Sequence, residues 1–305
     1  MEINENTPLE EVNDPVLKER KISLFIKRED LNHPHMSGNK WYKLKYNIQE
    51  AKEKGKDTLL TFGGAYSNHI YAVATAGKIY NLNTIGIIRG EEYNPLNPTL
   101  SFAKQNGMKI YYLDRASYRK KNSPEILNAL IKKFGEFYLL PEGGTNEFAV
   151  KGCSEIIGKI GKDFEYVCCP CGTGGTLAGL IAGLNGEKIA LGFAVLKGAT
   201  FLKENVDSLL TSFSEPSPKN WEINLDYHFG GYAKFNKKLL EFIKRFSTRT
   251  RIPIEPIYTG KMLFGIYQLV ENRFFKPETR VVAIHTGGLQ GLSGLQKKSL
   301  NKEKV

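Results

Sequence analysis

The chain has 305 residues, of which 41% are hydrophobic, and it carries a formal net charge of +11 at pH 7. Its length and its mean hydropathy of -0.34 predict a sizeable core and about two domains. Basic residues are mostly mixed with glutamates, and the one dense basic run, at 297–304, is predicted to be a solvated terminus. No nucleic-acid motif accompanies the charge, so we expect no nucleic-acid binding, although the charge does attract small anions.

Cysteine usage and the N-terminal composition predict a cytoplasmic protein. Three of the four cysteines crowd into residues 168–171, which disfavours a disulfide framework. The acidic N-terminal residues contain no apolar segment typical of a secretory signal. The Cys-x-x-Cys in this run lacks a second ligand pair, so we expect buried thiols rather than zinc or redox chemistry. For Cys171, which we place at the mouth of a loop, the sequence leaves open whether the thiol is reactive.

In chain order, residues 1–21 are polar without a clear period, and apolar runs then alternate with helical patterns. Residues 197–222 receive no assignment. Strands are predicted at 22–28, 58–62, 83–89, 109–113, 137–140, 164–169, 188–195 and 280–285, with a strand end at 256–258. Helices are predicted from Lys40 on, at 70–80, after 98, and at 124–134, 147–160, 177–184, 237–248 and 261–271. This alternation predicts βα units and parallel sheets.

One uncharged stretch, at 166–186, resembles a membrane helix because Gly175, Gly179 and Gly183 are spaced four residues apart. The stretch also holds a proline and further glycines, and its first part is typical of a strand and turn. We therefore expect no membrane span and expect these glycines to allow close packing against a sheet.

A lysine at a predicted helix start is the first candidate for chemistry. Lys40 follows the turn at 36–39, and the apolar residues after it are spaced three and four apart, so one helix face can pack. Ser37 or Asn39 can cap this helix. Unpaired N–H groups and the positive end of the helix dipole disfavour the ammonium and favour the neutral amine that forms a Schiff base. The alternative is a solvated surface lysine.

Three glycine-rich loops follow predicted strands, at 63–68, 172–176 and 286–288. Ligands bind at the carboxyl ends of strands in parallel sheets. The loop at 172–176 opens a helix, and its N–H groups with the hydroxyls of Thr173 and Thr176 suit a phosphate. It matches neither the dinucleotide fingerprint nor the P-loop, so it predicts the phosphate of a smaller cofactor. A plain packing turn is the alternative.

The remaining candidates are weaker. Ser67 can be a helix cap, a nucleophile, a proton shuttle or a carboxylate binder, and no Gly-x-Ser-x-Gly elbow surrounds it, which disfavours an α/β-hydrolase. His33 and His35 flank a proline, but no second ligand pair lies at a recognisable spacing. We therefore expect a loop there and no metal site.

Several short motifs stand in order between residues 22 and 294. They are Lys27-Arg28-Glu29-Asp30, Gly38-Asn39-Lys40, Lys43-Leu44, Gly63-Gly64-x-x-Ser67-Asn68, Gly172-Thr173-Gly174-Gly175-Thr176, Tyr258-Thr259-Gly260-Lys261 and His285-Thr286-Gly287-Gly288. This ordered set resembles the 1-aminocyclopropane-1-carboxylate deaminase/D-cysteine desulfhydrase group of the type II fold pyridoxal-phosphate enzymes.

The resemblance implies an α/β, tryptophan synthase β-like fold of two three-layer αβα domains with mainly parallel sheets. Residues 1–44 and 146–305 would form the large, cofactor-binding domain, and 45–145 an inserted small domain, with the cofactor between them. The cofactor would be pyridoxal 5'-phosphate. Lys40 would hold it as a Schiff base, Lys43 and the backbone from Gly172 to Thr176 would bind its phosphate, and Asn68 would hydrogen-bond its ring oxygen.

The same resemblance implies the substrate contacts of a small amino acid. Ser67 would touch the substrate carboxylate or assist proton transfer, and Tyr258 with, by a looser match, Tyr232 would face the substrate. Thr259 or Thr286 would lie near the pyridine nitrogen. In the deaminases these two positions hold a glutamate and a leucine, whereas here both are threonine, as in the desulfhydrases. A threonine brings no charge to the ring nitrogen, so the ring is a weaker electron sink.

These observations predict α,β-elimination from a D-amino acid such as D-cysteine, giving pyruvate, ammonia and hydrogen sulfide. One alternative is deamination of 1-aminocyclopropane-1-carboxylate to 2-oxobutyrate. Another, of a different class, is a non-catalytic pyridoxal-phosphate-binding protein. The stretch at 197–221 and the bulky Trp41 and Tyr42 depart from the group's pattern and leave the substrate open. Family habit implies a homodimer.

Overall fold

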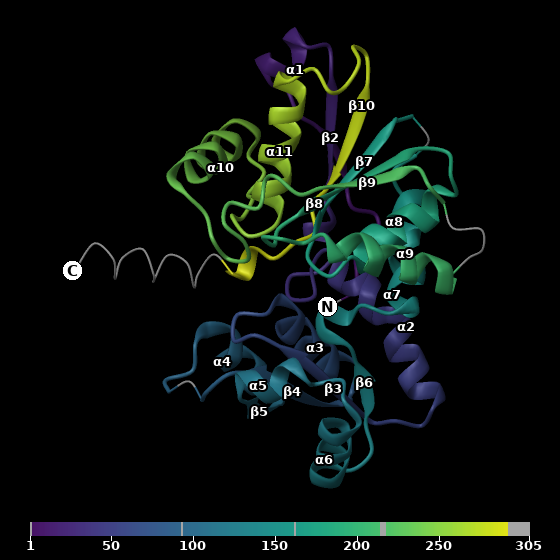
Figure 1. The fold of residues 1–305 in the computed structure, drawn as a ribbon, viewed down its shortest axis with the longest axis vertical. Coiled ribbons are helices and arrows are strands. Elements are labelled where there is room, and N and C mark those ends of the chain that lie inside the picture. Colours follow the sequence, from purple (N-terminus) through teal and green to yellow (C-terminus); the bar gives the residue numbers. More distant parts are fainter. Residues whose placement is uncertain (1, 93, 162, 214–217, 292–305) are drawn as a thin grey trace, which may run out of the picture. The chain divides into compact units, whose positions relative to one another are not determined.

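The computed structural model describes residues 2–92, 94–161, 163–213 and 218–291 (Figure 1). The chain divides into two units. Among the described residues, the large unit comprises 2–43 and 146–289, and the small unit comprises 44–145 with Gln290 and Gly291. The basic run at 297–304 lies outside the described residues.

The large unit is built on a six-stranded sheet in the order β1-β2-β10-β7-β8-β9. β1 pairs antiparallel with β2, and every other pair in this order is parallel. Strands β2 and β10, far apart in sequence, run side by side (Figure 1). The strands are β1 (Leu9–Glu11), β2 (Ser23–Lys27), β7 (Tyr166–Cys171), β8 (Ile189–Ala194), β9 (Trp221–Asn224) and β10 (Arg280–Ile284).

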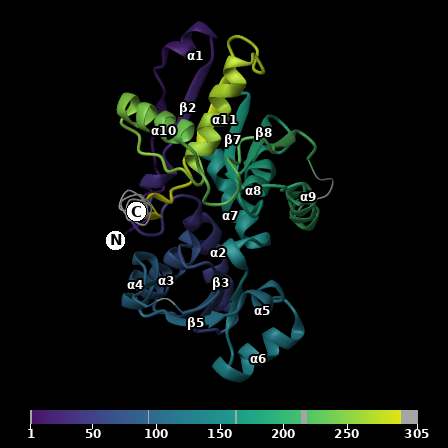
Figure 2. The same ribbon diagram turned by 60° about the vertical axis from the view of Figure 1, so that its left-hand side comes forward.

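Helices cover both faces of this sheet because alternate strand residues are apolar on both sides. On β10, Val281 and Ala283 pack toward α1, α10 and α11, whereas Val282 and Ile284 pack toward α7, α8 and α9. Figure 2 shows α10 and α11 lying together. The helices are α1 (Pro15–Glu19), α7 (Glu147–Gly158), α8 (Gly175–Leu184), α9 (Phe201–Phe213), α10 (Lys237–Thr250) and α11 (Thr259–Glu271).

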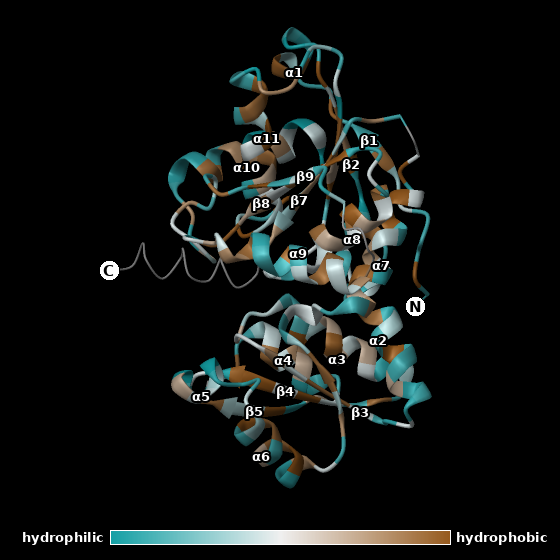
Figure 3. Ribbon diagram, turned by 45° about the vertical axis from the view of Figure 1, so that its right-hand side comes forward, coloured by the Kyte–Doolittle hydropathy of each residue, from teal (hydrophilic) through white to brown (hydrophobic). Residues whose placement is uncertain are grey.

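The small unit has a four-stranded, all-parallel sheet in the order β5-β4-β3-β6. Hydrophobic residues run along β3 and β4 (Figure 3), and their buried side chains pack against α5 and α6 on one face. The strands are β3 (Thr58–Gly63), β4 (Asn83–Arg89), β5 (Lys109–Leu113) and β6 (Tyr138–Leu140). The helices are α3 (Asn68–Tyr80), α4 (Pro98–Gln105), α5 (Arg115–Arg119) and α6 (Pro124–Phe134). The boundary at residue 43 falls within α2 (Asn39–Glu53).

The predicted α/β class with mainly parallel sheets is confirmed, one local prediction is wrong, and two stretches without an assignment hold elements. Residues 256–258 form a turn rather than a strand end, because the carboxylate of Glu255 binds the N–H groups of Ile257 and Tyr258. The polar segment before residue 22 holds β1 and α1. The unassigned stretch after residue 197 holds α9 and β9.

No helix among the described residues is long and apolar enough to cross a membrane. The glycine spacing in α8 serves packing, but against a helix rather than against the sheet as predicted. A Cβ on Gly179 would lie 2.3 Å from Cβ of Cys153, and one on Gly183 would lie 2.4 Å from the carbonyl oxygen of Ser154, both in α7. Absent side chains therefore let α7 and α8 approach closely.

The turn before Lys40 lies directly against the loop after β10. Gly38 has a φ of +69°, and a Cβ there would stand 2.0 Å from the carbonyl oxygen of Thr286. No side chain fits such a gap, because real Cβ contacts begin beyond 3 Å. Glycine at this position therefore sets the distance between the Lys40 turn and the Thr286 loop.

We expect Gly38→Ala to lower the stability of the protein by about 3 kcal/mol, since overpacking adds to the strain of the positive φ. Gly55 is the matched control, because it has a φ of +63° with nothing within 4 Å of an added Cβ. Gly55→Ala should therefore cost only about 1 kcal/mol. Urea unfolding of both variants measures the difference, and equal losses would show that the close approach carries no energy.

Candidate active site

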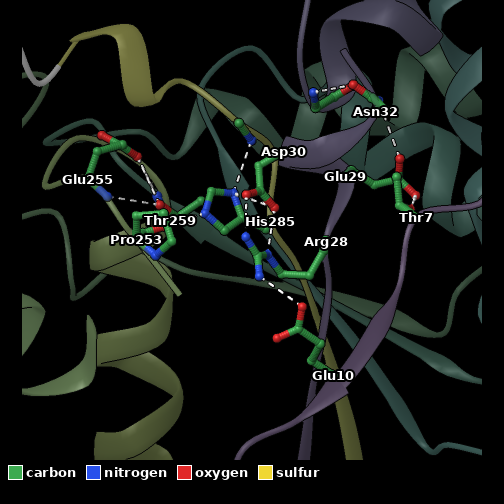
Figure 4. A network of polar contacts seen from close by, with 12 residues as sticks. Thr7, Glu10, Arg28, Glu29, Asp30, Asn32, Pro253, Glu255, Thr259 and His285 are labelled. Atoms are coloured by element: carbon green, nitrogen blue, oxygen red, sulfur yellow. Dashed lines mark hydrogen bonds and ion pairs between the residues drawn. The ribbon is translucent and has the colours of Figure 1, made fainter. Parts of the chain in front are cut away.

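A buried carboxylate holds the turn from which Lys40 starts. Glu29 has no exposed surface, and its backbone carbonyl accepts a 2.9 Å hydrogen bond from the N–H of Gly38. Its side chain accepts from the hydroxyls of Thr7 (2.9 Å) and Tyr42 (3.0 Å). Figure 4 shows Thr7 and Asn32 converging on this carboxylate. The start of α2 is thereby anchored on both sides of Lys40.

Asn39 links Lys40 to the glycine-rich loop at 172–176. Nζ of Lys40 donates to Oδ1 of Asn39 at 2.8 Å, and Nδ2 of Asn39 donates to Oγ1 of Thr176 at 2.7 Å. The lysine and the loop, 132 or more residues apart in the sequence, are therefore parts of one constellation. Asn39 is the first residue of α2, and its side chain makes this bridge.

The amine of Lys40 is poised to be neutral. Burial and, to a smaller extent, the positive charge of Lys43 lower the pKa of Lys40 to about 7, and the nearby Cys153 acts in the opposite direction. Burial also lowers the pKa of Lys43, whose neighbours include Cys169 and Cys171 at the end of β7. A substantial fraction of the Lys40 amine therefore carries a lone pair at neutral pH, as attack on a carbonyl requires.

The loop at 172–176, which we call the cradle, has the features of an anion-binding site. Gly174 is the N-cap of α8 in a left-handed conformation (φ +87°), and its helix start has no side-chain cap. Backbone N–H groups and the helix dipole at the start of a helix attract a phosphate. Lys43 adds positive charge near the end of β7, from which this loop begins. An aldehyde-reactive amine beside a phosphate cradle fits pyridoxal phosphate.

A second buried carboxylate organises the start of α11. Glu255 is 1% exposed, and Oε1 accepts from the N–H of Tyr258 at 2.9 Å and of Thr259 at 2.7 Å. The Thr259 hydroxyl donates to the same oxygen at 3.1 Å and accepts from the N–H of Glu255 at 3.3 Å. Burial raises the pKa of Glu255 against these hydrogen bonds. The Thr259 hydroxyl is therefore committed to Glu255 (Figure 4).

Thr286 follows a buried histidine that is fixed from both sides. Nε2 of His285 contacts the carbonyl oxygen of Pro253 at 2.7 Å, and Nδ1 lies 3.7 Å from Oδ1 of Asp30 (Figure 4). Arg28 binds both oxygens of Asp30, at 2.9 and 2.8 Å. Burial lowers the pKa of His285, which favours the neutral ring. This series of contacts holds the backbone that presents Thr286.

Two tyrosines lie beside the cradle. The rings of Tyr232 and Tyr258 meet edge to face with centroids 6.0 Å apart. A Cβ on Gly172 would lie 3.4 Å from Cε1 of Tyr258, so this ring rests on the first residue of the loop. Within the large unit, Lys40, the loop at 172–176 and the two tyrosines therefore lie in one region.

Ser67 and Asn68 belong to the small unit. Oγ of Ser67 accepts from the N–H groups of His69 (3.2 Å) and Ile70 (3.3 Å), which confirms that it caps α3. Oδ1 of Asn68 accepts from Nε2 of Gln290 at 2.9 Å. No sequence pattern pointed to Gln290, because this contact joins residues 222 positions apart.

The cysteines and His33, which were weaker candidates from the sequence, have structural roles. All four cysteines are free and buried, and burial raises the pKa of Cys171 to about 12, so its thiol stays protonated. Nδ1 of His33 accepts from the N–H groups of His35 and Met36, which makes this histidine a turn anchor. The described residues contain no group of three or more metal-ligating side chains.

Comparison with known proteins gives the family. The family model described as "Pyridoxal-phosphate dependent enzyme" matches residues 2–287. The chain belongs to this family.

Individual relatives indicate the group within this family. A mitochondrial bifunctional D-cysteine desulfhydrase/1-aminocyclopropane-1-carboxylate deaminase of Arabidopsis thaliana is 30% identical, covering 94% of this chain and 77% of the relative. The crystal structure of an ACC deaminase homologue superimposes with a TM-score of 0.86 at 28% identity, covering 99% and 95% of the two chains. Threonine deaminase isoform 2 of Solanum lycopersicum, at 19% identity and a TM-score of 0.68, shares the fold and covers 97% of this chain and 82% of its own. The protein is a type II fold pyridoxal-phosphate-dependent lyase of the deaminase/desulfhydrase group.

The pKa of Lys40 predicts how the protein captures pyridoxal, which has the aldehyde but lacks the phosphate. The rate should rise with pH through about 7 and level off above it, because only the neutral amine attacks. Lys43→Met removes the neighbouring positive charge, raises the pKa of Lys40, and should move the midpoint to higher pH. Absorbance measures the rate, with Lys40→Ala as the baseline for other lysines. A midpoint unmoved by Lys43→Met would contradict the assigned charge coupling.

Proposed function

We propose that the protein is a D-cysteine desulfhydrase. It would convert D-cysteine and water to pyruvate, ammonia and hydrogen sulfide by α,β-elimination followed by hydrolysis. The bound cofactor supplies the electron sink for the negative charge that develops at Cα. Lys40 takes the proton from Cα, and the C–S bond at Cβ breaks as the thiol leaves.

The observation that carries the proposal is the absence of a carboxylate side chain at positions 259 and 286. Both residues are threonine, and the Thr259 hydroxyl is bound to Glu255. Thr286, which is 7% exposed, is therefore the better candidate to approach the pyridine nitrogen. A neutral hydroxyl leaves the ring a moderate electron sink, sufficient to labilise an α-proton when a good leaving group stands at Cβ.

The other proposed contacts are those that the resemblance to the deaminase/desulfhydrase group implies. Lys43 and the loop from Gly172 to Thr176 would hold the phosphate. Tyr258 and Tyr232 would face the substrate, and from the small unit Ser67 would bind its carboxylate while Asn68 binds the ring oxygen. The Ser67 hydroxyl accepts two N–H groups as a cap and keeps its own proton to donate.

The second candidate is the deaminase activity, which the name of the Arabidopsis relative also carries. Opening a cyclopropane that has no α-hydrogen demands a stronger sink than elimination of a thiol. A non-catalytic cofactor-binding protein is the alternative of another class. A homodimer and a cytoplasmic location stay predictions.

Product assays separate these functions. We expect pyruvate and sulfide from D-cysteine, much less from L-cysteine, and no 2-oxobutyrate from 1-aminocyclopropane-1-carboxylate. Production of 2-oxobutyrate at a comparable rate would identify the deaminase instead. Cofactor absorbance without turnover of any amino acid would support the non-catalytic protein.

The double variant Thr259→Glu with Thr286→Leu tests the electronic argument. The negative charge of the introduced carboxylate should favour the protonated form of the ring nitrogen, so opening of the cyclopropane should rise from the wild-type background. Pyruvate formation from D-cysteine should fall about tenfold or more, as expected for a change above about 1.4 kcal/mol in barrier. The matched single variant Thr286→Leu removes the hydroxyl without adding charge. If the double variant gains nothing over it, ring protonation does not separate the two activities.

A further inference from the structure

One buried charge in the large unit has no part in the proposed reaction. Lys261 lies in the first turn of α11, three residues after Tyr258, and has no exposed surface. Its Nζ donates to the carbonyl oxygens of Gly231 at 2.7 Å, His228 at 2.8 Å and Val195 at 3.4 Å. A lysine ammonium has three N–H donors, and here each has a backbone carbonyl.

Placing this cation inside the protein costs free energy, which hydrogen bonds must offset. Burial lowers the pKa of Lys261 to about 8, and the carboxylate of Glu255 acts in the opposite direction. A methionine or leucine would fill the same space without that cost. The ammonium is therefore best explained by what its carbonyl partners do.

Two of those partners belong to one irregular segment, residues 225–236, which we call the Tyr232 loop. Its backbone takes left-handed conformations at Phe229, Gly230, Gly231 and Ala233, with φ between +53° and +117°. The backbone hydrogen bonds that this loop makes within the described part of the chain are short-range, as from the N–H of Gly231 to the carbonyl of His228 at 3.0 Å and from that of Lys234 to the carbonyl of Gly231 at 3.1 Å. An external anchor is needed to hold one conformation.

Packing adds a second anchor on the same helix. The ring of Phe229 meets that of Phe264 edge to face with centroids 5.0 Å apart. Lys261 and Phe264 are three positions apart, so they lie on one face of α11. The ring of Tyr227, in the same loop, also lies near that of Phe264, with centroids 6.2 Å apart. The loop is therefore held to α11 by these aromatic contacts and by the carbonyl contacts of a single ammonium.

The anchored carbonyl of Gly231 immediately precedes Tyr232. The Tyr232 ring is 45% exposed and touches Tyr258, which rests on Gly172 of the phosphate cradle. Lys261 and Tyr258 start the same helix. The position of Tyr232 over Tyr258 therefore depends on a contact made one helical turn further along α11.

We propose that Lys261 is a positioning residue that fixes Tyr232 against Tyr258 and so sets the affinity for the amino-acid substrate. It acts through the carbonyls of the Tyr232 loop and touches neither cofactor nor substrate. The proposal rests on the proposed function for the role of the two tyrosines, whereas the anchoring itself does not.

Lys261→Met tests the anchor, because methionine keeps the length and apolar stem but removes the ammonium. The matched control is Lys237→Met, which removes one charge from an exposed side chain at the start of α10. Trypsin cleaves after lysine, so cleavage after Lys234 reports on the freedom of the loop. We expect cleavage at least about tenfold faster in Lys261→Met than in the wild type or in Lys237→Met.

The second readout separates positioning from a structural role. In Lys261→Met the KM for D-cysteine should rise about tenfold or more, as for a misplaced positioning group, while kcat stays within about threefold and the affinity for pyridoxal phosphate is unchanged. Tyr232→Ala, a change at an exposed side chain, should raise KM as much. The double variant should be no worse than either single variant, because both act on one contact.

Two results would overturn the proposal. One is unchanged trypsin cleavage in Lys261→Met. The other is an unchanged KM in Tyr232→Ala, which is informative even if Lys261→Met does not fold. If the wild-type protein is inactive on every amino acid, the proposed function is wrong, and the trypsin experiment still tests whether Lys261 anchors the Tyr232 loop.

A chemical rescue tests the role of the ammonium. In Lys261→Ala, added propylammonium should slow trypsin cleavage again, whereas 1-propanol of the same size should not.

Discussion

Two lysines one helical turn apart, the half-buried Lys40 and the buried Lys43, create the electrostatic constraint on which the large unit depends. Lys43 lies near Cys169 and Cys171 at the end of β7, and Lys40 is linked through Asn39 to Thr176 in the first turn of α8. The start of α8 is itself positive. Like charges so close cannot all persist without an anion. Loss of a proton from Lys40 relieves part of this repulsion, because the pKa of Lys40 falls to about 7. The phosphate of the cofactor would neutralise the remaining positive charge, and a neutral amine is the form that reacts with an aldehyde.

This constraint explains why the segments around Lys40 and Lys43 are closely packed and fixed by hydrogen bonds. Small residues bring backbones together at Gly38, Gly152 and Gly179, where an added Cβ would stand within 2.3 Å of a neighbour. Buried charges then fix the segments. Glu29 holds the Lys40 turn, Glu255 holds the start of α11, and Lys261 holds the Tyr232 loop. Each charge is compensated by several backbone or hydroxyl groups, so it orders a segment rather than only adding stability.

Much of the fold follows from local sequence signals. Apolar runs ending in glycine-rich loops predict the parallel strands, and the small, polar turn before Lys40 predicts the start of α2. The capping role of Ser67 was one of several roles that its position at a helix start allowed. The error at 256–258 has a clear cause. Pro-Ile-Tyr has the composition of a strand, but the carboxylate of Glu255 binds the N–H groups of this segment and starts a helix.

The contacts that complete the site are long-range and leave no local pattern. The bridge from Asn39 to Thr176 joins residues 137 positions apart, and the bond from Lys261 to Gly231 spans 30. The glycines of α8 indicate close packing, but their spacing cannot say whether a sheet or α7 is the partner. The sequence therefore names candidate residues for the chemistry, but it does not indicate which residues position them.

The most direct test of the central claim is to find the lysine that binds the cofactor. The protein is loaded with pyridoxal phosphate, reduced with borohydride so that the carbon–nitrogen bond becomes permanent, digested, and mapped by mass spectrometry. We expect a single modified peptide carrying the cofactor on Lys40, and no modification after Lys40→Ala. Modification of Lys43, Lys261 or a surface lysine in place of Lys40 would contradict the assignment and the mechanism built on it.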